Sequence, residues 1–504
     1  DIVNVSVSRV RRGSGGNIFI LNRNNLGEED VDFLKAVSRI IIDRQEGKSL
    51  KQLVDNSISP EKLNNDKNYS FDKNWEAVSC YNFKIPPLLY FNDIGGFSEN
   101  GKSYVIVLKN YSNTPAPWIN VISNKKFGFH ISESGISYTW NKNSRENKLT
   151  AWSNDPVIDG EAEDIYVRDE ETGHVWSISP GPVRDSGQYV IEHGFGYSVF
   201  KHEADGITGK MTVFADIEDS VKVCRIRLHN ISSRNRIISV SYYVKLVLGV
   251  CHEQTAQYIY TRFNEEGKYI YARNPYSQNF KGICYLKLFG GSCLSYTGVR
   301  SEFIGRQGDV CKPCGLHFKR FSNTVGAGFD PCLVENVKVE LNSDSEEEII
   351  VLFGQEDTFE EIARVMKKYD HPEKTGQELK KAQNYWEDIL ETIQVDTPDD
   401  SMNIMLNGWL MYQVISCRYW SRTAFYQSGG AYGFRDQLQD VSAISYICPD
   451  MTREHIIYSA SRQYLEGDVQ HWWHPYVNSG IRTRFSDDLL WMPYVVEDYI
   501  KNTG

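Results

Sequence analysis

Residues 402–440 read MNIMLNGWLMYQVISCRYWSRTAFYQSGGAYGFRDQLQD, and this stretch decides the fold of the second half of the chain. The run Met402–Trp420 is apolar on most of its circumference when drawn as a helix, so it predicts a buried helix. The run Arg422–Asp440 that follows holds two arginines, two aspartates, three glutamines, four aromatic residues and three glycines. Polar groups at the mouth of a buried helix are costly unless they are paired or face a ligand. Flat rings beside carboxylates and amides favour a sugar pocket, and glycines allow backbone to approach it closely.

Three more helical patterns follow this stretch, and the loops between them are rich in Gly, Pro and aromatic residues. Helices that are apolar nearly all round and are joined by polar loops indicate the inner ring of a helical barrel. We therefore assign residues 399–504 to the first part of such a barrel. The three patterns are Leu438–Ile447, Thr452–Tyr464 and Leu489–Ile500.

Upstream of the barrel, apolar residues recur at every second position along short segments. Gly, Asn, Asp and Pro separate these segments. Residues 83–356 are predicted to form a large antiparallel β-sandwich, because no helical run separates the strand patterns. The clearest strand patterns are Tyr104–Leu108, Ser220–Leu228, Arg236–Val250, Lys268–Ala272 and Glu346–Phe353.

Helical patterns flank the sandwich on both sides. Residues 357–398 carry two amphipathic patterns at a spacing of 3.6 and are predicted to be a helical linker. Residues 1–82 are polar and are predicted to be an amino-terminal helical and linker segment, with helices at Glu28–Asp43 and Leu50–Val54 and a loop at Glu61–Lys73.

Composition limits the classes of function and partner. The chain has 504 residues, a net charge of −11 and an aromatic share of 13%, which suits a carbohydrate-handling protein. Excess negative charge argues against nucleic acid or an anionic membrane as a partner. No apolar run reaches the roughly 18 residues of a membrane-spanning helix. The ten scattered cysteines indicate free thiols and a cytoplasmic location, and the lone pair Cys311 and Cys314 lacks the further ligands that a metal site needs.

Two further loops concentrate polar and aromatic residues. The loop 467–475 places Trp472 and Trp473 between His471 and His474, which offers flat apolar faces beside hydrogen-bonding groups. The loop 482–491 carries Asp487 and Asp488 next to arginines. Each set has a plainer interpretation: the tryptophans pack, the histidines tie the loop down and the aspartates form internal ion pairs.

The order of these motifs resembles glycoside hydrolase family 94. The resemblance rests on Ser421-Arg-x-x-x-Tyr, Gly433-Phe-Arg-Asp-x-x-Gln-Asp, His471-x-x-x-Pro and Asp487-Asp-x-Leu-Trp. The longer stretches of sequence that contain these motifs are more similar to one branch of the family. That branch holds 1,2-β-oligoglucan phosphorylase and the carboxy-terminal module of cyclic β-1,2-glucan synthase. The sandwich segments 91–97, 114–120, 143–147 and 152–156 resemble the same branch.

The resemblance implies a β-sandwich, a helical linker and an (α/α)6 barrel of which only the first part is present. It also implies inverting phosphorolysis, in which a carboxylic acid protonates the glycosidic oxygen while phosphate attacks the anomeric carbon from the opposite face. The implied partners are a β-1,2-glucan or sophorooligosaccharide and inorganic phosphate, and the product is α-glucose 1-phosphate. No metal or organic cofactor is implied, and a homodimer is left open.

Site residues are carried over by motif. Arg422 matches a phosphate-binding arginine, the alternative being a buried ion pair. Asp436 matches the aspartate that holds sugar hydroxyls at subsite −1, the alternative being a helix N-cap. Arg435, Gln439 and Asp440 share that motif, and Arg435 orients Asp436 in this interpretation. In the sandwich, Arg145 of the 143–147 loop is expected to line the barrel mouth unless the loop is only a turn network.

One departure from the family concerns the general acid, which lies in a Trp-Asn-Asp-Gly type motif downstream of the Asp-Asp-x-Leu-Trp loop. No such motif follows Trp491, so we expect the acid beyond Gly504 and expect this chain to be part of a longer polypeptide. The stretch 429–433 also lacks an arginine that the cellobiose enzymes carry.

The predicted function is phosphorolysis of β-1,2-glucooligosaccharides. The alternatives are a chain-length-controlling module of cyclic β-1,2-glucan synthase and a non-catalytic β-glucan-binding protein.

Overall fold

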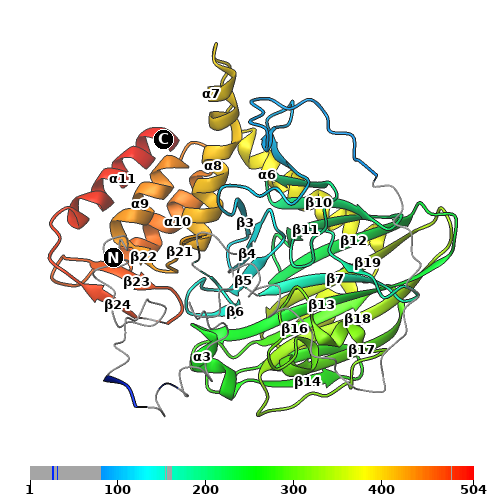
Figure 1. Cartoon of the computed structure of the whole chain (residues 1–504). Coiled ribbons are helices and arrows are strands. Elements are labelled where there is room, and N and C mark those ends of the chain that lie inside the picture. Colours follow the sequence, from blue (N-terminus) through cyan, green and yellow to red (C-terminus); the bar gives the residue numbers. More distant parts are fainter. Residues whose placement is uncertain are drawn as a thin grey trace. The chain divides into compact units, whose positions relative to one another are not determined.

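A computed structural model describes residues 25–27, 31, 81–153, 155, 160, 162–477 and 479–504. Apart from Val31, the two helices and the loop that the sequence predicts before residue 81 lie outside the described residues. The remainder consists of two antiparallel sheets followed by helices (Figure 1). The predicted fold class is therefore confirmed, while the boundaries drawn at residues 82, 356 and 398 stay predictions.

The first sheet has ten strands. The five strongest strand patterns in the sequence are all strands of the structure, four of them in this sheet and one in the second. Across the first sheet the order is β1 (Gly95–Phe97), β2 (Ser103–Leu108), β9 (Tyr189–Gly194), β10 (Tyr197–Ala204), β11 (Ile207–Ala215), β12 (Val221–Asn230), β19 (Glu346–Glu356), β16 (Ile283–Phe289), β15 (Tyr269–Arg273) and β14 (Tyr260–Asn264).

The second sheet has nine strands, and its longest, β13, joins two groups of them. The first part of β13 pairs with β18 on one side and β7 on the other, and its end pairs with β6. The strands are β17 (Ser292–Val299), β18 (Pro331–Leu341), β13 (Arg236–Gly249), β6 (Lys148–Thr150), β5 (Ser137–Asn141), β4 (Phe127–Ser132) and β3 (Ile119–Ser123), with β7 (Glu163–Asp169) and β8 (Val175–Trp176) beside β13. Short helical turns lie at α3 (His252–Thr255), Ala256–Tyr258, α4 (Arg300–Phe303) and Cys314–His317.

Strand β19 shows why its sequence is apolar on both faces. Ile349, Val351 and Phe353 belong to the main core between the two sheets. Ile350 and Leu352 point the other way and pack in a second core beneath helices α5 (Phe359–Tyr369) and α6 (Pro372–Leu390). Because side chains alternate across a strand, a sheet that is covered on both faces needs a continuous apolar run.

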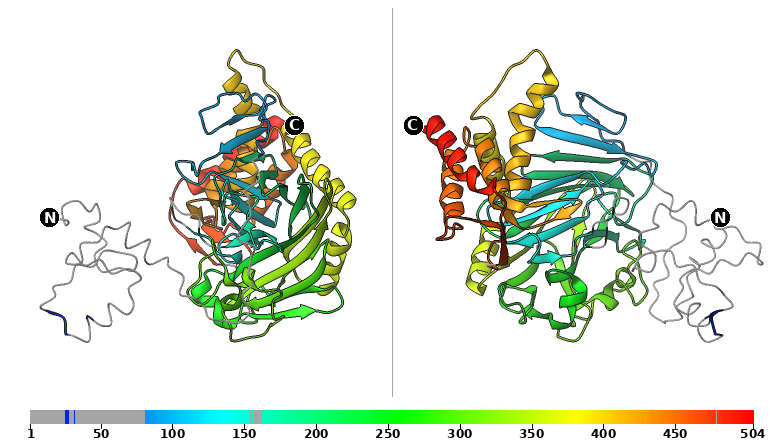
Figure 2. Two further views of the ribbon diagram at one scale, coloured as in Figure 1. Left: turned by 45° about the vertical axis from the view of Figure 1, so that its right-hand side comes forward. Right: turned by 90° about the vertical axis from the view of Figure 1, so that its left-hand side faces the viewer.

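Helix α5 is held against the first sheet by charge as well as by packing. Thr358 and Glu361 form a capping box at its start, which satisfies exposed backbone N–H groups there. Near its end, Lys368 Nζ lies 2.6 Å from Asp216 Oδ2, and Arg364 Nη2 lies 2.6 Å from Asp219 Oδ1. The yellow helices in Figure 2 lie along the sandwich accordingly.

The helical region begins with one long helical run, Asp400 to Ser421, that is less regular than the sequence predicts. Two stretches of π-helix, Met405–Trp409 and Val414–Ser421, interrupt α7 (Asp400–Ile404) and α8 (Leu410–Gln413). Three helices follow and differ from their predicted bounds by several residues. They are α9 (Phe434–Ala443), α10 (Pro449–Ala460) and α11 (Asp488–Thr503).

The segments between these helices are not all loops. The predicted loop 467–475 forms a strand, β23, that pairs with β22 and β24 in a small sheet. Two strands of two residues each, β20 and β21, pair with one another directly after Arg422. The bounds are β20 (Thr423–Ala424), β21 (Gln427–Ser428), β22 (Tyr432–Gly433), β23 (Gln470–His474) and β24 (Ser479–Arg482).

The helical region and the sandwich meet in a packed junction. The Tyr412 hydroxyl accepts a hydrogen bond from the Gly196 N–H at 3.1 Å and lies 3.0 Å from Asn120 Oδ1. Gly196 has φ of +78°, and a Cβ there would lie 2.3 Å from the Trp386 ring, so only glycine fits this turn.

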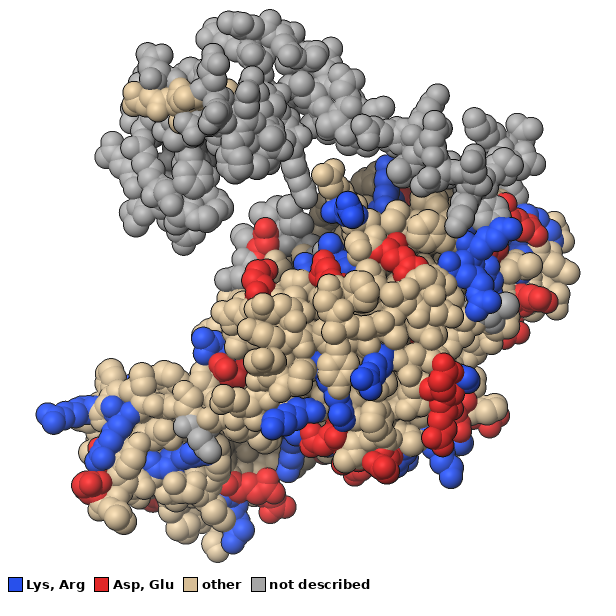
Figure 3. All heavy atoms as spheres, turned by 90° about the horizontal axis from the view of Figure 1, so that it is seen from below, with Lys and Arg blue, Asp and Glu red and all other residues tan. Residues whose placement is uncertain are grey.

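Among the described residues, no helix is long and apolar enough to cross a membrane. In the same part of the chain no group of three or more His, Cys, Asp or Glu side chains is placed to hold a metal ion. On the face seen from below, basic and acidic side chains are interspersed rather than gathered by sign (Figure 3).

We expect Tyr412→Phe to destabilise the protein by about 1–3 kcal/mol, because it leaves buried polar groups without their partner. The free energy of unfolding from urea titration measures this. Tyr446→Phe is the matched control, since the Tyr446 side chain is 58% exposed. Equal losses in the two variants would contradict the role of Tyr412 at the junction.

Candidate active site

Arg422 ends the long helical run in an unusual backbone conformation. Its φ of 48° and ψ of 44° are left-handed, which costs free energy in any residue but glycine. Its carbonyl oxygen accepts the N–H groups of both Gly429 and Gly430 at 3.1 Å. Its Nε donates to the Ala431 carbonyl at 2.9 Å. The backbone and the side chain of Arg422 are thus fixed together by one tight turn.

The guanidinium of Arg422 lies between two carboxylates of helix α9. Nη2 is 3.9 Å from Asp436 Oδ2 and Nη1 is 3.6 Å from Asp440 Oδ2. Burial lowers the pKa of Arg422 from its ordinary value and raises the pKa of Asp440, which Arg418 and Arg422 partly offset. Arg418 Nε donates to Asp440 Oδ1 at 2.6 Å, so Asp440 has a closer partner than Arg422.

Asp436 is placed in the first turn of α9, where the positive end of the helix favours a carboxylate. Its side chain is 43% exposed, in contrast to the 6% of Asp440. Gly433 precedes the helix, and a Cβ there would lie 2.4 Å from Asp436 Oδ2. Glycine at position 433 therefore gives the carboxylate room to face outward.

A cavity of about 380 Å³ lies in front of these groups. It brings together most of the site residues predicted from the sequence, from three separate segments of the chain. Three arginines line it, so a pocket on an acidic protein is locally rich in positive charge. The predicted residues on its wall are Arg145, Arg422, Arg435, Asp436, His471, Trp472 and His474.

Arg145 reaches this cavity from the sandwich because its loop is tied to the helical region. Asn143 Nδ2 donates to the Gly430 carbonyl at 2.7 Å, and Ser144 Oγ donates to the Ser421 carbonyl at 2.6 Å. Arg145 Nη1 then lies 3.1 Å from His474 Nε2. Burial lowers the pKa of His474 and the Arg145 charge lowers it further, which favours a neutral ring that accepts from arginine.

Other predicted residues take structural partners. Arg435 Nη1 lies 2.7 Å from Asp487 Oδ2, and His471 Nδ1 lies 2.7 Å from Asp488 Oδ2. These pairs match the plainer interpretation of the two aspartates as ion-pairing residues. They also orient Arg435 and His471, which line the cavity.

Five predicted site residues do not line the cavity: Gln439, Asp440, Trp473, Asp487 and Asp488. Trp473 is fully buried, and its indole N–H donates to the Tyr458 hydroxyl at 2.9 Å, so it has no face free for a sugar ring. It is a core residue, and only Trp472 fits the expected pair of sugar platforms. Gln439 is exposed on α9 and is not on the cavity wall.

Comparison with known proteins identifies the family. The description "Glycosyl hydrolase 94, supersandwich domain" matches residues 102–372, and "Glycosyl hydrolase 94 superfamily, catalytic domain" matches residues 385–504. The chain belongs to glycosyl hydrolase family 94. The second match covers the helices that carry Arg422, Asp436 and the cavity.

Relatives within family 94 include a synthase and several phosphorylases. The chain is 36% identical to cyclic β-(1,2)-glucan synthase NdvB of Rhizobium meliloti, over 82% of this chain and 15% of that protein. It is 26% identical to N,N'-diacetylchitobiose phosphorylase of Vibrio furnissii, over 81% of this chain and 55% of that protein. It is 27% identical to solabiose phosphorylase of Paenibacillus borealis, over 81% of this chain and 52% of that protein. The chain thus spans about half the length of the two phosphorylases and a smaller part of the synthase.

Among solved structures, a bacterial glucoamylase complexed with acarbose matches with a TM-score of 0.46 and 10% identity. The match covers 79% of this chain and 59% of the glucoamylase. It carries no argument about function.

Arg418 also belongs to the site, although the sequence motifs do not indicate it. It lies one helical turn before Arg422, so the spacing of the two arginines was the available signal. Arg418 Nε holds Asp440 Oδ1 at 2.6 Å, whereas Arg422 Nη1 lies 3.6 Å from the other oxygen, Oδ2.

We expect Arg418→Ala to destabilise the protein by about 1–3 kcal/mol near neutral pH, because buried Asp440 loses its nearest cation. Burial has already raised the folded pKa of Asp440 above its ordinary value of 3.8. The folded state therefore binds more protons than the unfolded state just above pH 3.8, and stability falls as pH rises through that window. Removing Arg418 raises the folded pKa further, so the loss in the variant should grow as pH rises from about 4.

Urea unfolding at several pH values measures this difference. Arg453→Ala on the same helical region is the control, since Arg453 is exposed on α10 and should give little change at any pH. A loss in Arg418→Ala that stays constant from pH 4 to pH 8 would exclude a role through Asp440.

Proposed function

We propose that this chain forms the glucan- and phosphate-binding part of an inverting phosphorylase that acts on β-1,2-linked glucooligosaccharides. One observation carries the proposal: Arg422 and Asp436 face the same cavity, with Nη2 and Oδ2 3.9 Å apart. That distance exceeds the roughly 2.7–2.9 Å of a direct charge-assisted hydrogen bond. Both groups therefore keep hydrogen-bonding capacity for a ligand that lies between or beside them.

In the proposed reaction a phosphate oxygen forms a bond to the anomeric carbon as the bond from that carbon to the glycosidic oxygen breaks. The glycosidic oxygen leaves with a proton from a general acid, which gives a shortened glucan. Attack from the opposite face turns a β-linkage into α-glucose 1-phosphate. We assign the proton donor to no side chain of this cavity.

The residues of the cavity have different roles in the proposed reaction. Arg422 presents a planar pair of N–H donors, which suits two oxygens of one phosphate. Asp436 accepts hydrogen bonds from sugar hydroxyls, and the half-buried Trp472 ring offers a face to the pyranose. Phosphate is itself the nucleophile, so the proposal needs no metal and no organic cofactor.

A chain-length-controlling module of cyclic β-1,2-glucan synthase is the second candidate, and the 36% identity to the Rhizobium meliloti synthase favours it. The same cavity would then shorten linear β-1,2-glucans and so set their length. The kcat/KM for sophorose compared with that for long linear β-1,2-glucan, measured on the polypeptide that also supplies the general acid, separates the two. Preference for short substrates favours the phosphorylase, and preference for long chains favours the module.

We expect Arg422→Ala to raise the phosphate KM by about 10- to 100-fold, because a charged hydrogen-bond partner is worth about 1.5–3 kcal/mol. We expect Asp436→Ala to abolish most turnover and to weaken sophorose binding by a similar factor. Release of α-glucose 1-phosphate from sophorotriose, by the polypeptide that also supplies the general acid, measures the first effect. Titration calorimetry of the chain with sophorose measures the second.

Arg453→Ala, an exposed substitution outside the cavity, controls for general effects of losing an arginine. Sophorose binding by Asp436→Ala at wild-type strength, or an unchanged phosphate KM in Arg422→Ala, would show that these residues were wrongly assigned.

A further inference from the structure

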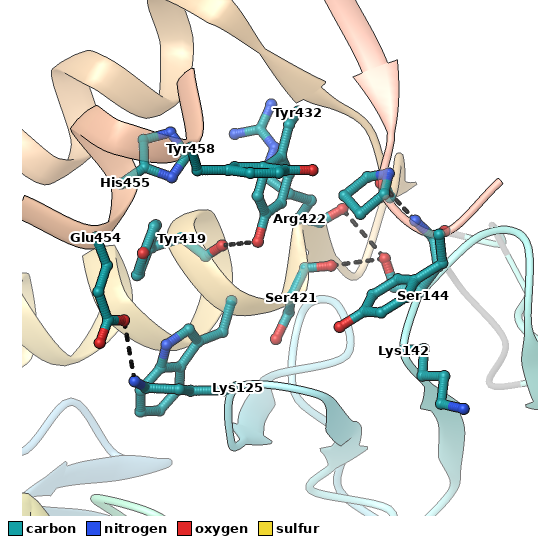
Figure 4. A pocket seen from close by; sticks show the side chains of 15 residues that line it. Lys125, Lys142, Ser144, Tyr419, Ser421, Arg422, Tyr432, Glu454, His455 and Tyr458 are labelled. Atoms are coloured by element: carbon teal, nitrogen blue, oxygen red, sulfur yellow. Dashed lines mark hydrogen bonds and ion pairs between the residues drawn. The ribbon is translucent and has the colours of Figure 1, made fainter. Parts of the chain in front are cut away.

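A second cavity, of about 390 Å³, adjoins the first at Arg422. Tyr432, His455 and Tyr458 of the helical region line one side, and Lys125, Lys142 and Ser144 of the sandwich loops line the other (Figure 4). Of the residues that line the two cavities, only Arg422 is common to both. The two cavities therefore meet at Arg422, and the other residues of the second cavity have no part in the proposed phosphorolysis.

Three residues of its wall each have a buried polar atom with no hydrogen-bond partner among the described residues: Trp420 Nε1, Ser421 Oγ and His455 Nε2. Ser421 and His455 are 3% and 2% exposed. Leaving such groups unpaired is costly, so a cluster of three on one cavity wall calls for an explanation. A ligand with several hydroxyl groups would satisfy them once these side chains turn toward the cavity, since the three atoms have almost no accessible surface as they stand.

Apart from Arg422, the lysines around this cavity are paired with carboxylates and the histidine is neutral. Lys125 Nζ lies 3.2 Å from Glu454 Oε2, and Lys142 Nζ lies 2.9 Å from Asp357 Oδ2. Burial lowers the pKa of His455 to about 4, so its ring is neutral near pH 7. The part of the wall away from Arg422 therefore suits a neutral ligand better than an anion.

Aromatic rings supply the apolar part of the wall. The Tyr432 hydroxyl donates to the Tyr419 carbonyl at 3.1 Å, and the Tyr458 hydroxyl accepts from Trp473 Nε1 at 2.9 Å. These bonds hold the rings in place, so their faces are fixed before any ligand arrives. Fixed rings beside hydrogen-bonding groups fit the alternating apolar faces and hydroxyl edges of a sugar.

We propose that this second cavity is a saccharide-binding site that takes part of a β-1,2-glucan chain away from the reacting end. The identity of the ligand as a β-1,2-glucan rests on the proposed function, whereas the site itself rests on Trp420, Ser421 and His455. Its volume lies in the range of pockets that enclose small organic ligands, about 300–1,000 Å³.

Titration calorimetry of the full chain with sophorotetraose, without phosphate, tests the proposal. The wild type should bind at two sites, and Asp436→Ala should keep one of them. Trp420→Phe retains a ring but loses the N–H donor, and Ser421→Ala loses the hydroxyl. Each should weaken the remaining site about five- to tenfold in the Asp436→Ala background.

The outcomes separate this inference from the proposed function. Loss of all binding in Asp436→Ala overturns the second site and leaves the first intact. Two-site binding that Asp436→Ala does not alter, but that Ser421→Ala weakens, supports the second site and contradicts the first. No binding of sophorotetraose by the wild type removes both.

Thermal unfolding of the ligand-free protein gives an independent test. Ser421→Ala removes a buried hydroxyl without a partner, so it should raise Tm by about 1–3 °C. Ser144→Ala is the matched control and should lower Tm, because its hydroxyl donates to the Ser421 carbonyl. A fall in Tm for both variants would mean that the Ser421 hydroxyl is already satisfied, and the proposal would fail.

Discussion

The position of one guanidinium, that of Arg422, is the constraint on which the site depends. A left-handed backbone and a hydrogen bond to the Ala431 carbonyl fix it at the end of a long helical run. Arg418 supplies the close partner of Asp440, so the buried carboxylate does not draw Arg422 into a short ion pair. A guanidinium that its own turn holds in place, and that forms no short ion pair with a carboxylate, keeps N–H donors for an incoming anion.

The sandwich is part of the site and does more than support it. Asn143 and Ser144 donate to backbone carbonyls on either side of Arg422, and Arg145 then extends to the cavity wall. Those bonds cross from a sheet loop to a helix end that lies far along the sequence. The packing of Tyr412 and Trp386 against the strands behind them keeps that loop and that helix end in register.

Much of this architecture could be predicted from the sequence, because the spacing of apolar residues shows which faces of a helix or strand are buried. The strand β19 and the helices of the second half were found in this way, and the motif around Arg435 and Asp436 located the cavity. The tryptophan pair was misjudged because residues 470–474 pair with Tyr432 and Gly433, which are distant in sequence. Once that segment is a strand, neighbouring side chains point to opposite faces, so Trp472 meets the cavity and Trp473 enters the core. The pairing of Arg418 with Asp440 was also out of reach, since it depends on how two helices cross.

The turn after Arg422 is a wall common to two cavities, and this has a thermodynamic consequence. A ligand on one side that favours a particular arrangement of the turn must change the affinity for a ligand on the other side. Reciprocity requires the influence to be equal in both directions. Cooperativity between distant parts of one glucan chain, or between glucan and phosphate, would then arise from a few residues of backbone without any movement of domains.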